Sequence, residues 1–148
     1  MVTTSIPTST TTTTARICPI EQLSDGDQVK LSLMRQYRDT LLRKTPTGRA
    51  YVKLFYRHAL EVTAILAKNS SITAEAKNIL NTMLPEVDAA VQGKAVTISQ
   101  AQSDGIISVL NAIENEASPD LKRSIQRIKR DLRRTRVLGK LGMKKINR

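Results

Sequence analysis

The stretch RQYRDTLLRKTPTGRAYVKLFYRH, residues 35–58, decides how this chain folds. It contains every aromatic residue of the protein and the one histidine, His58. Pro46 ends a helix in its middle, because proline disfavours helical geometry in the residue before it. On both sides of this break apolar residues recur at spacings of three and four, which is typical of one apolar stripe along a helix. The stretch therefore predicts a helical hairpin that bends at residues 46–48.

The aromatic side chains of the second helix fit a structural part. Tyr51 and Phe55 are four residues apart on the apolar face, which favours core packing over stacking on nucleobases. Tyr56 points elsewhere and can anchor a side contact through its hydroxyl. His58 lies beside the same stripe, so we expect a partly buried, hydrogen-bonded histidine at a helix interface.

The polar residues of the hairpin predict how the two helices meet. Asp39 is the one acid among several arginines, and we expect it to pair with Arg35 or, across the hairpin, with Arg49. Gly48 stands beside Arg49 at the bend, where the absence of a side chain lets two backbones approach closely. We therefore expect this stretch to specify a fold, and a side chain at Gly48 to cost stability.

Helical periodicity continues through most of the remaining chain. Only 6 glycines and 5 prolines interrupt it, which is too little punctuation for many short strands. Aromatic residues make up 3% of the chain, so the core must consist of Leu, Ile, Val and Ala. The pattern predicts an all-α fold, a small antiparallel bundle of about five helices, over residues 24–135. Pro85 lies within the third helix and is expected to kink or end it.

The two ends of the chain differ from the bundle in composition. Residues 1–22 are rich in Thr and offer little to bury against the cost of ordering a backbone, which predicts a disordered leader or linker. Residues 136–148 carry glycines and basic residues without periodicity, which predicts a frayed basic tail.

Charge is concentrated at one end. The net charge is +11; residues 1–118 hold 12 Lys/Arg against 11 Asp/Glu, and residues 119–148 hold 12 against 2. The narrow apolar seam of the last helix favours docking on the bundle with a solvent-facing basic stripe. The alternative is contact with an acidic partner, nucleic acid or an anionic surface, through 119–148. The basic residues concerned are Lys122, Arg123, Arg127, Lys129, Arg130, Arg133, Arg134 and Arg136.

Residues for catalysis are sparse. One histidine excludes a multi-histidine metal site, and Cys18 with His58 lacks an evident third orienting partner. No glycine-rich phosphate-binding loop is present. We therefore expect no enzyme activity, no metal and no cofactor. No apolar run approaches the ~20 residues of a membrane span, and the start lacks a signal peptide, so we expect a cytoplasmic protein unless the chain is the end of a longer secreted one.

Residues 18–69 resemble the bacterial CFI-box C-terminal domain. Cys18-Pro19-Ile20 stands where that family has its Cys-Phe-Ile box. Two segments depart from the pattern: EQLSDGDQ replaces an alanine-rich, glycine-containing stretch after the box, and ALEV replaces a Ser-Pro after the aromatic pair. The residues that carry the resemblance are Met34, Arg35, Tyr37, Arg38, Asp39, Leu42, Gly48, Arg49, Phe55, Tyr56 and His58.

The resemblance implies a helical module that closes secreted or surface-associated bacterial proteins, with a part in sorting or anchoring. Together with the residues above, it predicts a non-catalytic accessory or interaction module whose partner is an unidentified protein. The alternative function is nucleic-acid binding through the basic C-terminal helix and tail. No pattern in the chain indicates an oligomeric state.

Overall fold

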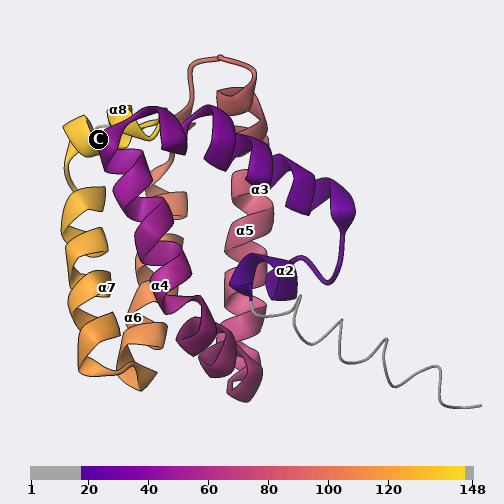
Figure 1. Ribbon diagram of the computed structural model, residues 1–148, viewed down its shortest axis with the longest axis vertical. Coiled ribbons are helices and arrows are strands. Elements are labelled where there is room, and N and C mark those ends of the chain that lie inside the picture. The colour runs from indigo at the N-terminus through magenta and orange to yellow at the C-terminus, as the bar shows by residue number, and fades with distance from the viewer. Residues whose placement is uncertain (1–17, 146–148) are drawn as a thin grey trace, which may run out of the picture.

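The computed structural model describes residues 18–145 and shows an all-α bundle, as the periodicity predicts (Figure 1). Five longer helices carry the fold, and short elements flank and join them. The elements are α2 (Pro19–Leu23), α3 (Gln28–Thr40), the 3-10 turn η2 (Leu42–Lys44), α4 (Pro46–Lys68), α5 (Ser70–Val91), β1 (Thr97–Ile98), α6 (Gln100–Glu116), α7 (Pro119–Leu132), α8 (Thr135–Lys140) and β2 (Lys144–Lys145).

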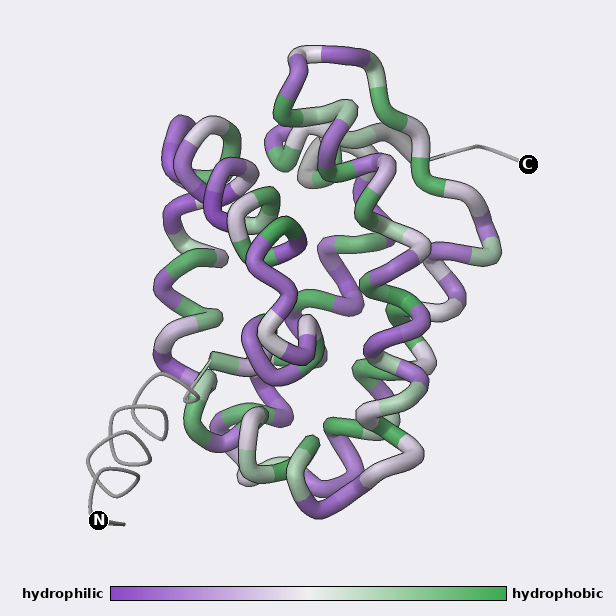
Figure 2. Tube along the Cα trace, turned by 90° about the vertical axis from the view of Figure 1, so that its right-hand side faces the viewer, coloured by the Kyte–Doolittle hydropathy of each residue, from purple (hydrophilic) through white to green (hydrophobic). Residues whose placement is uncertain are grey.

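Helices α4 to α7 run side by side, each antiparallel to the next in the chain (Figure 1). Short connections enforce this, because Asn69 alone separates α4 from α5. Apolar stretches recur along each helix, as the colours of Figure 2 show, and apolar residues spaced three or four apart share one side of a helix. Those sides meet in a first apolar cluster, which contains Ile65, Leu66, Ile72, Ala76, Val109, Ile113, Leu121 and Ile125.

Helix α3 crosses one end of these four helices and packs on α5 (Figure 1). A second apolar cluster forms there, and residues from the C-terminal end of the chain complete it. The Tyr37 hydroxyl donates a hydrogen bond of 2.6 Å to the carbonyl of Leu141, and β1 pairs in parallel with β2. The buried members of this cluster are Tyr37, Val87, Ala90, Val96, Ile98, Leu138 and Met143.

Order therefore extends beyond residues 24–135 at both ends. Residues 19–22, expected within the leader, form most of α2, in which Pro19 is buried as the first helical residue. Residues 136–145 were expected to be frayed, but α8 is helical and Leu138 and Met143 are 3% and 8% exposed. These two side chains find apolar partners far away in the sequence, which periodicity within the segment cannot reveal. The rest of the predicted leader and tail lies outside the described residues.

Pro85 neither ends nor divides its helix, since α5 runs unbroken through residues 86–91. Proline removes the backbone hydrogen bond to the carbonyl four residues earlier, which normally kinks a helix. Here that carbonyl belongs to Asn81. In the next position, the side-chain amide of Gln102 in α6 donates to the Thr82 carbonyl at 3.1 Å and to Glu86 Oε2 at 2.8 Å. The neighbouring helix therefore supports the turn that contains the proline.

The bend between α3 and α4 is as tight as the sequence predicts. Thr45 caps α4 by accepting a hydrogen bond from the Gly48 amide at 3.0 Å, and Pro46 occupies the first helical position, where its missing N–H costs nothing. A Cβ atom on Gly48 would lie 2.0 Å from the backbone oxygen of Leu42. Direct backbone contact at Gly48 thus fixes where α4 leaves η2.

Gly48→Ala is expected to lower the free energy of unfolding by about 2 kcal/mol or more, because backbone rather than a flexible side chain must move to admit the methyl group. Gly139→Ala is the matched control, since a Cβ there meets no atom within 4 Å and alanine favours a helix. Urea unfolding of both variants measures the difference. Equal stability of the two variants would contradict the close approach.

Candidate functional site: an apolar cavity between α3 and α4

Helices α3 and α4 diverge from the bend at Gly48 and form a V, of which the two helices are the arms (Figure 1). Helix α3 packs closely on α5 but not on α4, so the space between the arms is not closed by direct helix contact. Helix α2 packs on α4 and α5 at the open end of the V (Figure 1). The arrangement leaves a cavity beside the most aromatic part of the chain.

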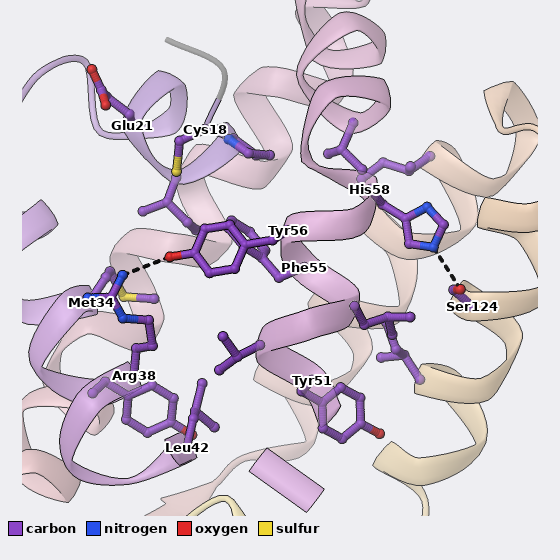
Figure 3. Close-up of a pocket in the computed structure, with 18 of the residues that line it drawn as sticks. Cys18, Glu21, Met34, Arg38, Leu42, Tyr51, Phe55, Tyr56, His58 and Ser124 are labelled. Atoms are coloured by element: carbon purple, nitrogen blue, oxygen red, sulfur yellow. Dashed lines mark hydrogen bonds between the residues drawn. The ribbon is translucent and has the colours of Figure 1, made fainter. Parts of the chain in front are cut away.

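The cavity has a volume of about 620 Å³ and is lined by side chains from α2, α3, α4, α6 and α7. Its walls are mainly aliphatic, and Phe55 and Tyr51 of α4 add aromatic surface (Figure 3). Both aromatic residues are only half-buried, so they line a cavity instead of filling the core as expected. Aliphatic residues that line it include Leu31, Met34, Val52, Val62, Ile113 and Ile125.

Charged and polar groups lie at the rim of the cavity. The Arg38 guanidinium donates a hydrogen bond of 2.7 Å to the Tyr56 hydroxyl, which connects α3 to α4 (Figure 3). The same guanidinium contacts both carboxylate oxygens of Asp39, at 2.8 and 3.2 Å. Its proximity holds the pKa of Asp39 below the usual range. Arg35, one turn earlier on α3, lines the cavity and is exposed.

The predicted partners of Asp39 are therefore wrong. Asp39 pairs with the adjacent Arg38 and, at 3.3 Å, with Arg43 one turn later. Arg49 instead donates to the backbone carbonyl of Arg43 at 3.1 Å. The reason is geometric: α4 leaves the hinge at an angle, so Arg49 reaches only the turn itself. Arg49 and Gly48 shape the bend and do not line the cavity.

His58 is 6% exposed, and its Nε2 lies 2.9 Å from Ser124 Oγ of α7 (Figure 3). The sequence predicts a partly buried, hydrogen-bonded histidine at a helix interface. The interface and the hydrogen bond are confirmed, and the burial is deeper than expected. The sequence analysis did not identify Ser124 as the hydrogen-bond partner of His58. The one feature that pointed to it is a small polar residue between Leu121 and Ile125 in an otherwise apolar seam. Both His58 and Ser124 also line the cavity.

A serine beside a histidine is a potential nucleophile and base. Ser124 lies in the middle of α7, however, where neighbouring backbone amides are used within the helix and cannot stabilise an oxyanion. Among the residues that the structure describes, no carboxylate is hydrogen-bonded to His58. The pair therefore fits a buried hydrogen bond that joins α4 to α7.

The residues that the sequence singled out in the hairpin separate into two groups. Asp39, Gly48 and Arg49 do not line the cavity. Arg35, Tyr37, Arg38, Phe55, Tyr56 and His58 all line the cavity. Cys18, Pro19 and Ile20 of the predicted leader join them there, and periodicity gave no indication of that contact. In Figure 3 Cys18 lies near Tyr56, whereas the carboxylate of Glu21 lies farther out.

The basic helix α7 docks on the bundle, with Leu121 and Ile125 buried. Several of its charges are neutralised by ion pairs. Asp120 contacts Arg57 at 2.9 Å and Arg123 at 3.4 Å, Asp131 contacts Arg127 at 3.9 Å, and Glu114 contacts Lys129 at 2.6 Å. Among the described residues Lys122, Arg130, Arg133 and Arg134 are exposed and in no ion pair. The side chain of Arg136 lies outside the description.

Across residues 18–145, no helix is long and apolar enough to cross a membrane. In the same part of the chain no group of His, Cys, Asp and Glu gathers in a way that could hold a metal ion. Comparison with protein-family models, with curated proteins and with solved structures gives no match to this chain. Two features of the described residues remain as candidate binding sites: the cavity, and the basic face formed by Lys122, Arg130, Arg133 and Arg134 at α7.

Tyr37 joins the cavity to the C-terminal end of the chain, because it lines the cavity and bonds Leu141. Burial raises the pKa of its phenol to about 12. An exposed phenol in the unfolded chain has a pKa of about 10. The folded protein therefore retains a proton that the unfolded chain releases between these two pH values.

Stability is accordingly expected to fall as pH rises from 10 to 12, because the unfolded state binds fewer protons there. The loss due to Tyr37 is about 2–3 kcal/mol. Tyr37→Phe removes the Tyr37 part of this dependence, at the cost of about 1 kcal/mol at neutral pH from the lost bond to Leu141. The part due to Tyr51 remains, because burial and the hydrogen bond to Asp131 raise the pKa of that phenol as well. Chemical unfolding of both proteins along a pH series measures the difference; parallel curves above pH 10 would contradict the burial of this phenol.

Proposed function

We propose that this chain is a non-catalytic helical interaction module that takes an apolar group into the cavity between α3 and α4. The observation that carries the proposal is the cavity itself, about 620 Å³ with mainly aliphatic walls. This volume is within the range of 300–1,000 Å³ that is typical of ligand pockets. Apolar walls in contact with water are unfavourable, and an apolar group that displaces the water recovers that free energy.

A binding role also agrees with the placement of polar groups. The polar contacts at the cavity hold helices together: Arg38 bonds Tyr56 between α3 and α4, and His58 bonds Ser124 between α4 and α7. Both contacts stiffen the walls of a preformed site, which lowers the entropic cost of binding. We propose no reaction for this site, because the serine–histidine pair found among residues 18–145 lies within regular helix without donors for an oxyanion.

The resemblance to the CFI-box domain supports a place for this module at the C-terminal end of a bacterial surface or secreted protein. Cys18, Pro19 and Ile20, which stand at the position of the box, line the same cavity as Phe55 and Tyr56. The two parts of the resemblance, far apart in the sequence, thus lie around one site. We propose that the box segment and the aromatic segment act together in binding, with sorting or anchoring as the biological role.

The cavity can be tested with N-phenyl-1-naphthylamine, a neutral dye that fluoresces in apolar surroundings. Val52→Trp places a large side chain on the cavity wall and is expected to weaken dye binding at least about tenfold by occupying the site. Val29→Trp is the matched control, since Val29 lies on α3 with 78% of its surface exposed. Circular dichroism verifies that both variants fold. Absence of dye binding to the unaltered protein, or equal binding by both variants, would overturn the proposal.

A second candidate function is nucleic-acid binding through α7. The observation that favours it is the set of exposed basic residues without an ion pair among the described residues, including Arg130, Arg133 and Arg134. Each cation that neutralises a phosphate releases counterions, which makes binding steeply dependent on salt. Deleting 119–148 would remove part of the core, so point substitutions are the better test.

If this face binds nucleic acid, replacing Arg130, Arg133 and Arg134 together by Ala is expected to reduce the slope of log K against log salt by about 3. Arg57→Ala is the control, because that guanidinium is already paired with Asp120. Fluorescence anisotropy with a labelled duplex at several salt concentrations gives both slopes. Micromolar or tighter binding at about 150 mM salt that the triple substitution abolishes would favour this function; an unchanged slope would exclude this face.

A further inference from the structure

We propose that the apolar group bound in the cavity is an acyl chain with an anionic head, and that Arg35 binds the head at the rim. This inference rests on the proposed function and adds the chemical class of the ligand. Two observations carry it together: the aliphatic interior of the cavity and the charge of its rim. Neither alone identifies a ligand.

The interior suits an unbranched hydrocarbon chain. Side chains from five helices surround the space, and the deeper ones, such as Ile113 and Ile125, come from the first apolar cluster. Polar groups on the lining are engaged elsewhere, since Tyr37 bonds Leu141 and His58 bonds Ser124. A ligand with polar groups along its length would leave those groups unpaired, which is costly away from water.

Three charged side chains lie on the lining, Arg35 and Arg38 of α3 and the one acid Glu21. Arg38 is already bound to Asp39 and Tyr56. Arg35 lies in no ion pair among the described residues, so its guanidinium is available. A planar guanidinium binds a carboxylate through two parallel hydrogen bonds, which favours an anionic head over a cationic one.

The position of Arg35 fits the geometry of such a ligand. It precedes Arg38 by three residues, so both guanidinium groups belong to one face of α3. The Arg38–Tyr56 bond spans from α3 to α4 beside it. A chain that enters between the helices therefore leaves its head next to Arg35, in contact with water, while its tail passes toward α6 and α7.

Displacement of N-phenyl-1-naphthylamine by three twelve-carbon compounds tests the inference, at concentrations below micelle formation. Laurate is expected to bind at least about threefold more tightly than dodecanol, the gain of an exposed ion pair. Dodecyltrimethylammonium is expected to bind more weakly than both. Affinity is expected to rise about fourfold for each CH₂ added between octanoate and decanoate, because each is buried in the cavity.

Arg35→Gln keeps a polar side chain and is expected to abolish the preference for laurate over dodecanol without changing dodecanol binding. Lys30→Gln is the matched control, since it removes one positive charge from the same helix away from the cavity lining. A second readout uses Cys18, the only cysteine of the chain, which lines the cavity. Bound laurate is expected to slow its reaction with a maleimide, in the Lys30→Gln variant as well.

The outcomes separate the inference from the proposed function. Equal binding of laurate and dodecanol, or an undiminished preference for laurate in Arg35→Gln, overturns the anionic head and leaves an apolar binding site. Undiminished laurate binding by Val52→Trp places the ligand elsewhere and overturns the inference. Bound dye that none of the three compounds displaces overturns the inference alone, whereas absence of dye binding to the unaltered protein overturns both the inference and the proposed function.

Discussion

The contact between the backbone of Gly48 and that of Leu42 is the constraint on which the rest of the structure depends. It fixes the direction in which α4 leaves the hinge, because a Cβ at that position would lie 2.0 Å from a carbonyl oxygen. With α3 held on α5, that direction opens the space beside Phe55 and Tyr56. The most aromatic part of the chain thus becomes a lining rather than a core, since a bend without side-chain bulk sets the helices at this angle.

Much of the fold could be predicted from local pattern. The five longer helices, the hinge at Pro46 and the burial of His58 all follow from residues within a few turns of one another. Asp39 shows the limit even over short range, because four arginines lie within ten residues of it and only the path of the backbone selects Arg38 and Arg43. At Pro85, α5 continues unbroken and receives a side-chain hydrogen bond from Gln102 of another helix, a contact that no propensity includes.

The candidate site was less accessible to prediction, and for a physical reason. A cavity is a volume that side chains leave unfilled. Its presence depends on how five helices, α2, α3, α4, α6 and α7, are placed relative to one another, and not on the periodicity of any one of them. Some of the residues that line it, such as Phe55 and His58, are predicted from the sequence, but as structural residues of a hairpin. Their second role follows only from the angle between α3 and α4. Arg35, expected to pair with Asp39, is instead left at the rim.

The second apolar cluster has a consequence for the order of folding. The first cluster joins four helices that are consecutive in the chain, α4, α5, α6 and α7. The second joins Tyr37 to Leu138 and Met143, and the bond from Tyr37 to Leu141 spans 104 positions. Contacts of such separation form late, because closing a long loop costs entropy before the contact repays it. The contacts of α3 with the C-terminal segment are therefore expected to form after those within the four-helix body.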